Sequence, residues 1–151
     1  TINAEIRVVS ALIGSAGETR TIVNVSGFNR DALQSSLAKV TEEIEKLKDE
    51  LKYLKNEVSL YTNVHGLTRE QKREHEKIKD KLYKVQDRIK ELEFERKTLS
   101  GYLKARGEGE ISVLKKCFPN TQLSIKQFTK EITSPVLSTT YIVQDGELKE
   151  I

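Results

Sequence analysis

LQSSLAKVTEEIEKLKDELKYLKNEVSLY, residues 33–61, is the stretch that decides the fold. Its apolar residues recur at alternating steps of four and three, which keeps them on one stripe of a helix and is typical of a coiled coil. Residues 78–103 follow the same spacing, with Arg96 at one stripe position. Together they predict two long helices. The central residues of the two stripes are Leu37, Val40, Ile44, Leu47, Leu51, Ile78, Leu82, Val85, Ile89 and Leu92.

The two stripes also predict how the helices pack. In an antiparallel pair the residue numbers of facing positions add up to a constant, and pairing Leu47 with Leu82 gives 129. The same register places Leu54 opposite His75, and its midpoint falls within residues 63–67. The stripes therefore predict a long antiparallel coiled-coil α-hairpin with a single fold-back.

The fold-back carries its own signals. Gly66 suits the left-handed residue that ends a helix. Thr68, followed three residues later by Gln71, is a capping box that starts the second helix. Closure of the loop explains these residues, but an exposed tip is also a candidate contact loop for a protein partner. The predicted contact residues are Asn63, Val64, His65, Gly66 and Leu67.

Segments rich in β-branched residues lie on both sides of the hairpin and predict strands. Asp145-Gly146 predicts a tight β-hairpin turn. The order of elements predicts a discontinuous β unit, residues 1–28 plus 107–151, interrupted by the hairpin at residues 29–106. Its short strands suit a β-solenoid as well as a small sandwich or barrel. The predicted strands lie within residues 2–13, 21–25, 111–114, 123–132, 139–143 and 147–151.

Composition limits the possible partners and compartments. The net charge of +3 is small and both signs are interspersed, which disfavours nucleic-acid binding. The single cysteine, Cys117, excludes an intramolecular disulfide and fits a reducing compartment. No apolar run reaches the roughly eighteen residues of a membrane span, and no signal-peptide pattern opens the chain. The absence of Met predicts that the sequence is a fragment of a longer protein.

The sequence predicts no catalytic, cofactor or metal site. His65 and His75 lie ten residues apart without a cysteine cluster, and Cys117 has no histidine close in sequence. Residues 14–17 lack the Lys-Ser/Thr that follows a phosphate loop. His75 on the stripe is either a pH-sensitive switch or a polar residue tolerated near a hydrated tip, and we favour the second interpretation.

Several short motifs flank the hairpin. LIGSAG at residues 12–17 and Thr21 before a strand precede it, and ISV at 111–113, FPNT at 118–121 and LSI at 123–125 follow it. This order of motifs resembles the C-terminal half of the flagellar assembly protein A family. Asn120 stands where that family usually has Gly, and Asn tolerates a left-handed conformation. The resemblance implies a right-handed parallel β-helix with an inserted coiled coil, in a cytoplasmic bacterial protein linked to flagellar assembly and without known catalysis.

We therefore expect an α+β fold in which a β-solenoid segment carries the coiled-coil hairpin, and a non-enzymatic structural or interaction module with the hairpin as its docking arm. Protein partners are expected, including self-association through the unpaired solenoid ends, but neither nucleic acid nor membrane insertion. The alternative is the hairpin-and-β domain of a periplasmic adaptor, or membrane fusion protein, of a transport complex. An adaptor would carry an export signal and an Arg/Leu/Ser docking pattern at the tip, and the sequence shows neither.

Overall fold

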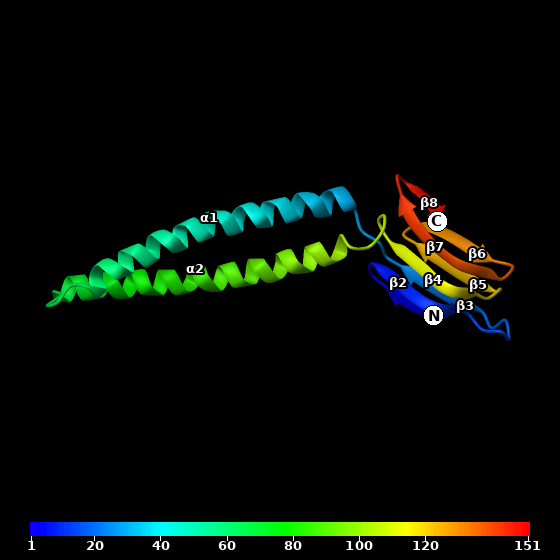
Figure 1. The fold of residues 1–151 in the computed structure, drawn as a ribbon, viewed down its shortest axis with the longest axis horizontal. Coiled ribbons are helices and arrows are strands. Elements are labelled where there is room, and N and C mark those ends of the chain that lie inside the picture. The colour runs from blue at the N-terminus through cyan, green and yellow to red at the C-terminus, as the bar shows by residue number, and fades with distance from the viewer. The chain divides into compact units, whose positions relative to one another are not determined.

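A computed structural model describes residues 1–151 and shows an α+β fold (Figure 1). The chain divides into two compact units. The β unit consists of Thr1–Leu33 and Gly101–Ile151, and the helical hairpin consists of Gln34–Ser100. The elements are β1 (Ile2–Ala4), β2 (Arg7–Ile13), β3 (Thr21–Val25), α1 (Arg30–Thr62), α2 (Arg69–Tyr102), β4 (Glu110–Cys117), β5 (Thr121–Ile125), β6 (Phe128–Ile132), β7 (Val136–Gln144) and β8 (Glu147–Glu150).

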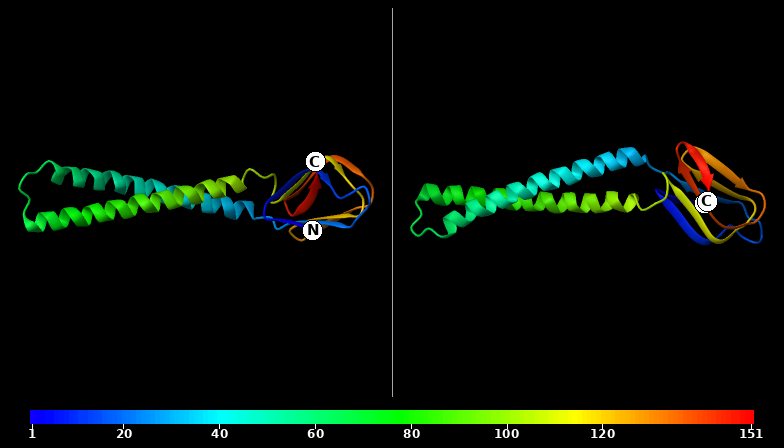
Figure 2. Two further views of the ribbon diagram at one scale, coloured as in Figure 1. Left: turned by 90° about the horizontal axis from the view of Figure 1, so that it is seen from below. Right: turned by 45° about the horizontal axis from the view of Figure 1, so that its top comes forward.

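The β unit is built from two four-stranded sheets, which Figure 2 shows from two further sides. Sheet A has the order β1-β3-β5-β6, and sheet B has the order β2-β4-β7-β8. The first strands of each sheet pair in parallel, whereas β6, β7 and β8 pair in antiparallel fashion. Buried side chains of both sheets form one core cluster, to which Val23 and Leu123 contribute from sheet A and Ile111 and Tyr141 from sheet B.

The expected right-handed parallel β-helix is wrong, because both sheets are mixed and neither closes into a solenoid coil. In a parallel β-helix, strands that pair in neighbouring coils run in the same direction. Here Ile125 pairs with Phe128, so the chain reverses at Lys126 and β6 runs antiparallel to β5. Lys126 adopts a φ of 55°, a left-handed conformation for which Gly or Asn would be the usual sequence signal.

Two other turns agree with the sequence. Asp145 and Gly146 have φ values of 55° and 74°, and Gln144 pairs with Glu147 across them, which confirms the predicted tight turn between β7 and β8. Asn120 has a φ of 58°, so it takes the left-handed position expected of it.

Both helices begin at side-chain caps. The backbone N–H of Ala32 donates to Asn29 Oδ1 at 3.0 Å at the start of α1. The N–H of Thr68 donates to Gln71 Oε1 at 2.9 Å, and the N–H of Gln71 donates to Thr68 Oγ1 at 3.2 Å. This reciprocal pair confirms the predicted capping box of α2.

The stripe residues of α1 and α2 pack against each other in the helical hairpin. Two clusters form, one around Ile44 and Leu92 and one around Leu54, Val85 and Ile89. Of the ten central stripe residues, Val40, Ile44, Val85, Ile89 and Leu92 are buried, and Leu37, Leu47, Leu51, Ile78 and Leu82 are half-buried.

The helices pack one heptad away from the predicted register. Tyr61 stacks on His75, with ring centroids 5.4 Å apart, although the prediction placed His75 opposite Leu54. Ile44 correspondingly clusters with Leu92 and not with Val85. A heptad pattern is unchanged by a shift of seven residues, so periodicity alone leaves both registers possible.

Candidate protein-contact surfaces

The tip of the helical hairpin, residues 63–67, is an exposed loop. Asn63, Val64 and His65 are exposed, and Leu67 is half-buried. Gly66 has a φ of 75°, and no atom lies within 4 Å of the position where a Cβ would stand. The loop therefore offers side chains that no packing within the chain requires.

The interface between α1 and α2, which we call the seam, ends next to the tip with a pair of aromatic rings. The rings of Tyr61 and His75 are stacked with an interplanar angle of 25°. His75 Nε2 is buried without a hydrogen-bond partner. The imidazole ring of His75 therefore packs face to face against the Tyr61 ring in the last layer of the seam.

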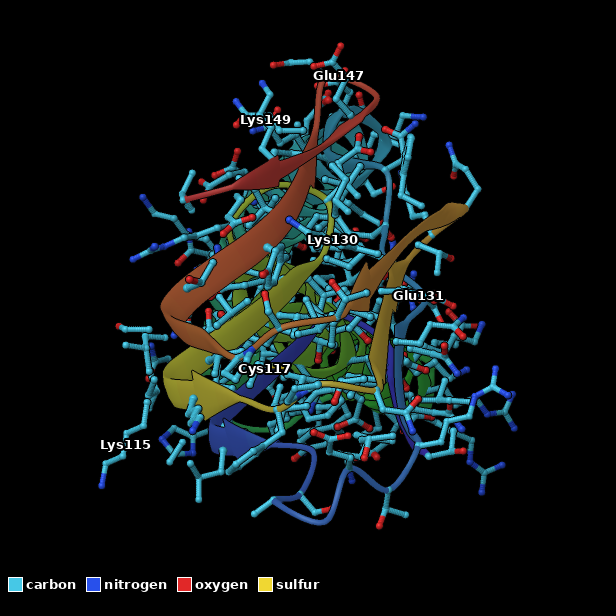
Figure 3. All side chains as sticks on the ribbon, turned by 90° about the vertical axis from the view of Figure 1, so that its right-hand side faces the viewer. Lys115, Cys117, Lys130, Glu131, Glu147 and Lys149 are labelled. Atoms are coloured by element: carbon cyan, nitrogen blue, oxygen red, sulfur yellow. The ribbon has the colours of Figure 1, made fainter.

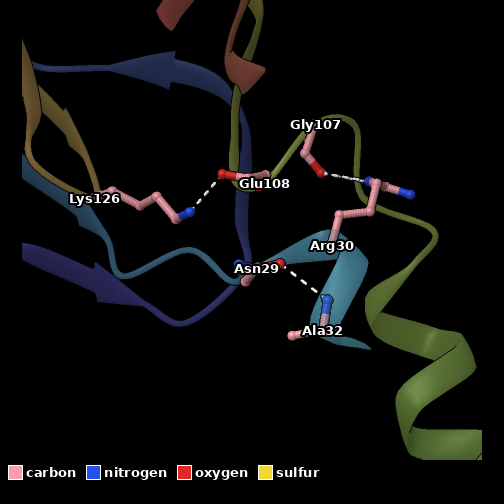
Figure 4. A network of polar contacts seen from close by, with 6 residues as sticks. All are labelled: Asn29, Arg30, Ala32, Gly107, Glu108 and Lys126. Atoms are coloured by element: carbon pink, nitrogen blue, oxygen red, sulfur yellow. Dashed lines mark hydrogen bonds and ion pairs between the residues drawn. The ribbon is translucent and has the colours of Figure 1, made fainter. Parts of the chain in front are cut away.

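Arg30, the first residue of α1, binds the segment that follows α2 (Figure 4). Its Nε and Nη2 donate to the carbonyl oxygen of Gly107 at 3.0 and 2.8 Å. Its guanidinium also donates to the carbonyl oxygens of Leu103, at 3.5 Å, and of Ala105. These carbonyls lie just beyond the end of α2, and one arginine with five donors satisfies all three. Arg30 thus joins the start of α1 to the segment that follows α2.

The segment that follows α2 also contacts the two sheets, through Gly107 and Glu108. Lys126 Nζ forms an ion pair with Glu108 Oε2 (Figure 4), and the N–H of Glu108 donates to the carbonyl of Val143 at 2.7 Å. Gly107 has a φ of 60°, and a Cβ on it would stand 2.3 Å from the carbonyl oxygen of Val143. Only glycine fits this position, so the segment has little freedom of sequence or conformation.

The four sheet edges differ in how they are protected. The β6 edge carries Lys130 (Figure 3). Its Nζ forms an ion pair with Glu150 of β8 at 2.5 Å and lies 4.9 Å from the ring centroid of Tyr141 in β7. The β8 edge has the sequence ELKE, in which charges dominate. The opposite edges are β1 and β2, and β2 has the sequence RVVSALI with one charge. Inward lysines and charges protect an edge. The β1 edge, INA, has neither and β2 has only Arg7, so β1 and β2 are the open edges.

Cys117 is buried in the core of the β unit. Burial raises the pKa of its thiol, which is opposite to the shift that activates a cysteine nucleophile. No three His, Cys, Asp or Glu side chains gather in a geometry that would hold a metal ion. Neither helix combines the length and the apolar character needed to cross a membrane.

Residues 1–148 match the family described as "Flagellar Assembly Protein A beta solenoid domain". The chain belongs to the flagellar assembly protein A family. This confirms the resemblance found in the sequence. No curated protein and no solved structure matches the chain. Membership indicates a role related to flagellar assembly, and flagellar assembly protein A is not a known enzyme family.

The motifs that carry the flagellar assembly protein A resemblance have clear structural roles. Gly14 has a φ of 83°, and a Cβ there would stand 2.6 Å from Thr121 Oγ1, so glycine is required. The Asn120 side chain donates from Nδ2 to the carbonyl of Glu18 at 2.7 Å. Asparagine therefore replaces glycine in this turn without strain and adds a hydrogen bond between two loops. The family match favours a flagellar assembly protein A module over the hairpin-and-β domain of a periplasmic adaptor.

Sequence reasoning missed two features of these surfaces. Arg30 gave no signal, because nothing in the sequence marks an arginine at the start of a helix as the donor to backbone carbonyls 73 to 77 residues later. The exposed leucines of sheet B, among them Leu12 and Leu137, could have been found from strand alternation, since each is next to a core residue, Ile13 or Val136.

Proposed function

We propose that this chain is a non-enzymatic interaction module of a cytoplasmic bacterial protein that acts in flagellar assembly. Its helical hairpin serves as a coiled-coil arm that presents the tip, residues 63–67, to a protein partner. The β unit holds the arm, and the open edges β1 and β2 pair with a strand of another polypeptide.

The exposure of the tip on a conformationally fixed loop carries the proposal. Gly66 supplies the left-handed residue, and the Thr68–Gln71 capping box fixes the start of α2. Neither device uses the side chains of Asn63, Val64 or His65. A loop whose shape is independent of its exposed side chains is a suitable docking element, because it is preorganised and loses little entropy on binding.

The test replaces Asn63, Val64, His65 and Leu67 by Ser in the full protein of the encoding bacterium and keeps Gly66, so that the turn is retained. We expect fewer flagella per cell in electron micrographs at unchanged protein level. The matched control, Phe94→Ser, removes an exposed aromatic side chain of α2 and is expected to leave flagellation unchanged. Normal flagellation with the serine tip would refute docking through the tip, and recovery of the protein outside the cytoplasmic fraction would refute the compartment.

A further inference from the structure

Sheet B carries an apolar patch on the side that faces away from the core. Leu12, Lys116 and Leu137 are neighbours across β2, β4 and β7 in the pairing register. Their sequence neighbours Ile13, Cys117 and Val136 belong to the core or pack against it, so these three residues point outward. The exposed large apolar residues of the patch, 49–69% exposed, are Val9, Leu12, Leu114 and Leu137.

The charges on this patch are positive. Arg7, Lys115 and Lys116 form none of the ion pairs of the chain, and Figure 3 shows Lys115 extending away from the sheets. The one carboxylate on these strands, Glu110, is buried and accepts hydrogen bonds from the N–H of Arg106 and from Ser112 Oγ. We call Arg7, Val9, Leu12, Leu114, Lys115, Lys116 and Leu137 the basic face.

The distal half of α1 has a surface of opposite charge. Tyr53 and Leu60 are both 62% exposed, and because they are seven residues apart they lie on one side of the helix. Asp49 and Glu57 lie one turn before and one turn after Tyr53 and form no ion pair, and Glu50 pairs only with Lys81 of α2. We call Asp49, Glu50, Tyr53, Glu57 and Leu60 the acidic stripe.

The two surfaces complement each other and repel copies of themselves. Two basic faces, or two acidic stripes, would place like charges opposite each other, which costs free energy in a desolvated contact. A basic face against an acidic stripe pairs the charges and covers exposed leucines with Tyr53 and Leu60. We propose that the acidic stripe of one copy of this chain docks on the basic face of a second copy. The contact is heterologous, so each copy keeps one surface free for a further copy.

The test measures self-association of the full chain by sedimentation velocity over a range of concentrations. The face variant is Leu12→Ser with Leu137→Ser, and the stripe variant is Tyr53→Ser with Leu60→Ser. Each is expected to weaken self-association by about tenfold or more, since apolar residues at the centre of a contact dominate affinity. The matched control, Tyr83→Ser with Phe94→Ser, removes side chains of α2 that are 59% and 74% exposed and should leave association unchanged.

Mixing the face variant with the stripe variant gives the decisive result. Each variant retains the surface that the other lacks, so the mixture is expected to form a one-to-one pair that stops at two chains. Circular dichroism of each variant shows whether the fold is intact. A monomeric parent chain, variants that are not rescued by mixing, or equal loss in the control would overturn the proposal. Association that persists in both variants would also overturn it and would point to the β1 and β2 edges.

Discussion

The β unit and the helical hairpin bury apolar side chains in different geometries. In the β unit, eleven buried residues from both sheets form one cluster. In the helical hairpin, two clusters of three buried residues each lie along a single seam. A residue between two sheets has packed neighbours on all sides, whereas a seam residue has solvent close to both flanks. Equal burial of two side chains therefore does not imply equal packing around them.

The sharpest test of this difference is the same substitution in each region. Ile111 of β4 and Ile44 of α1 are both fully buried. Because the cost of a truncation depends on how well the site collapses, we expect Ile111→Ala to lower the free energy of unfolding by about 4 kcal/mol and Ile44→Ala by about 2.5 kcal/mol. Urea denaturation followed by circular dichroism measures both. Equal losses would show that the seam is packed as firmly as the sheet core.

Gly107 and Gly66 provide a second matched pair, in which the larger single loss is smaller than the loss expected for Ile111→Ala. Gly107 and Gly66 both have positive φ values, so alanine brings a similar backbone strain of about 1 kcal/mol at each. At Gly107 the new Cβ would also stand 2.3 Å from the carbonyl oxygen of Val143, whereas at Gly66 it meets open space. We expect Gly107→Ala to cost about 3 kcal/mol and Gly66→Ala about 1 kcal/mol. Thermal melts of the two variants would contradict this if Gly66→Ala were the more destabilised.

The smallest expected effect concerns Tyr141 in the β core. Burial, assisted by the Glu150 carboxylate, raises the pKa of Tyr141 to about 12. In an unfolded chain a tyrosine titrates near pH 10. The folded state holds the proton to higher pH, so this contribution to stability is complete below about pH 10 and is lost as the pH rises towards 12.

Tyr141→Phe separates this effect from other alkaline titrations. The hydroxyl of Tyr141 is buried without a hydrogen-bond partner, so we expect its removal to change stability at neutral pH by less than about 1 kcal/mol. The variant should lose less stability than the parent between neutral pH and about pH 11 in urea titrations. Identical pH profiles would show that Tyr141 ionises as readily in the folded chain as in the unfolded one.

Local signals in the sequence predicted local structure well. The heptad stripes located both helices, Thr68 and Gln71 located the cap, and Asp145-Gly146 located a turn, because each depends on residues a few positions apart. The helix register depends on a choice between patterns seven residues apart, which the stripe leaves open. The reversal at Lys126 uses a left-handed lysine, so the antiparallel course of β6 had no sequence signal.

The contact surfaces were predictable to different extents. The tip followed from the hairpin, since a fold-back between two long helices has few neighbours. The basic face did not, because Leu12, Lys116 and Leu137 come together only through strand pairing across the inserted hairpin. Arg30 was missed for the same reason, as its carbonyl acceptors follow the whole hairpin in sequence. Features that depend on long-range pairing require the topology first.

The bond between Arg30 and Gly107 has a consequence for the order in which the chain folds. β3 and β5, which pair through Val23 and Leu123, are separated by the whole hairpin. Loop closure over an unstructured chain costs about 0.6 kcal/mol more for each doubling of its length, and contacts distant in sequence slow folding. When α1 and α2 form first from their own neighbours, the insertion becomes a short link whose ends Arg30 holds together. We therefore expect the helical hairpin, once formed, to shorten the search that β4 and β5 must make for their partners.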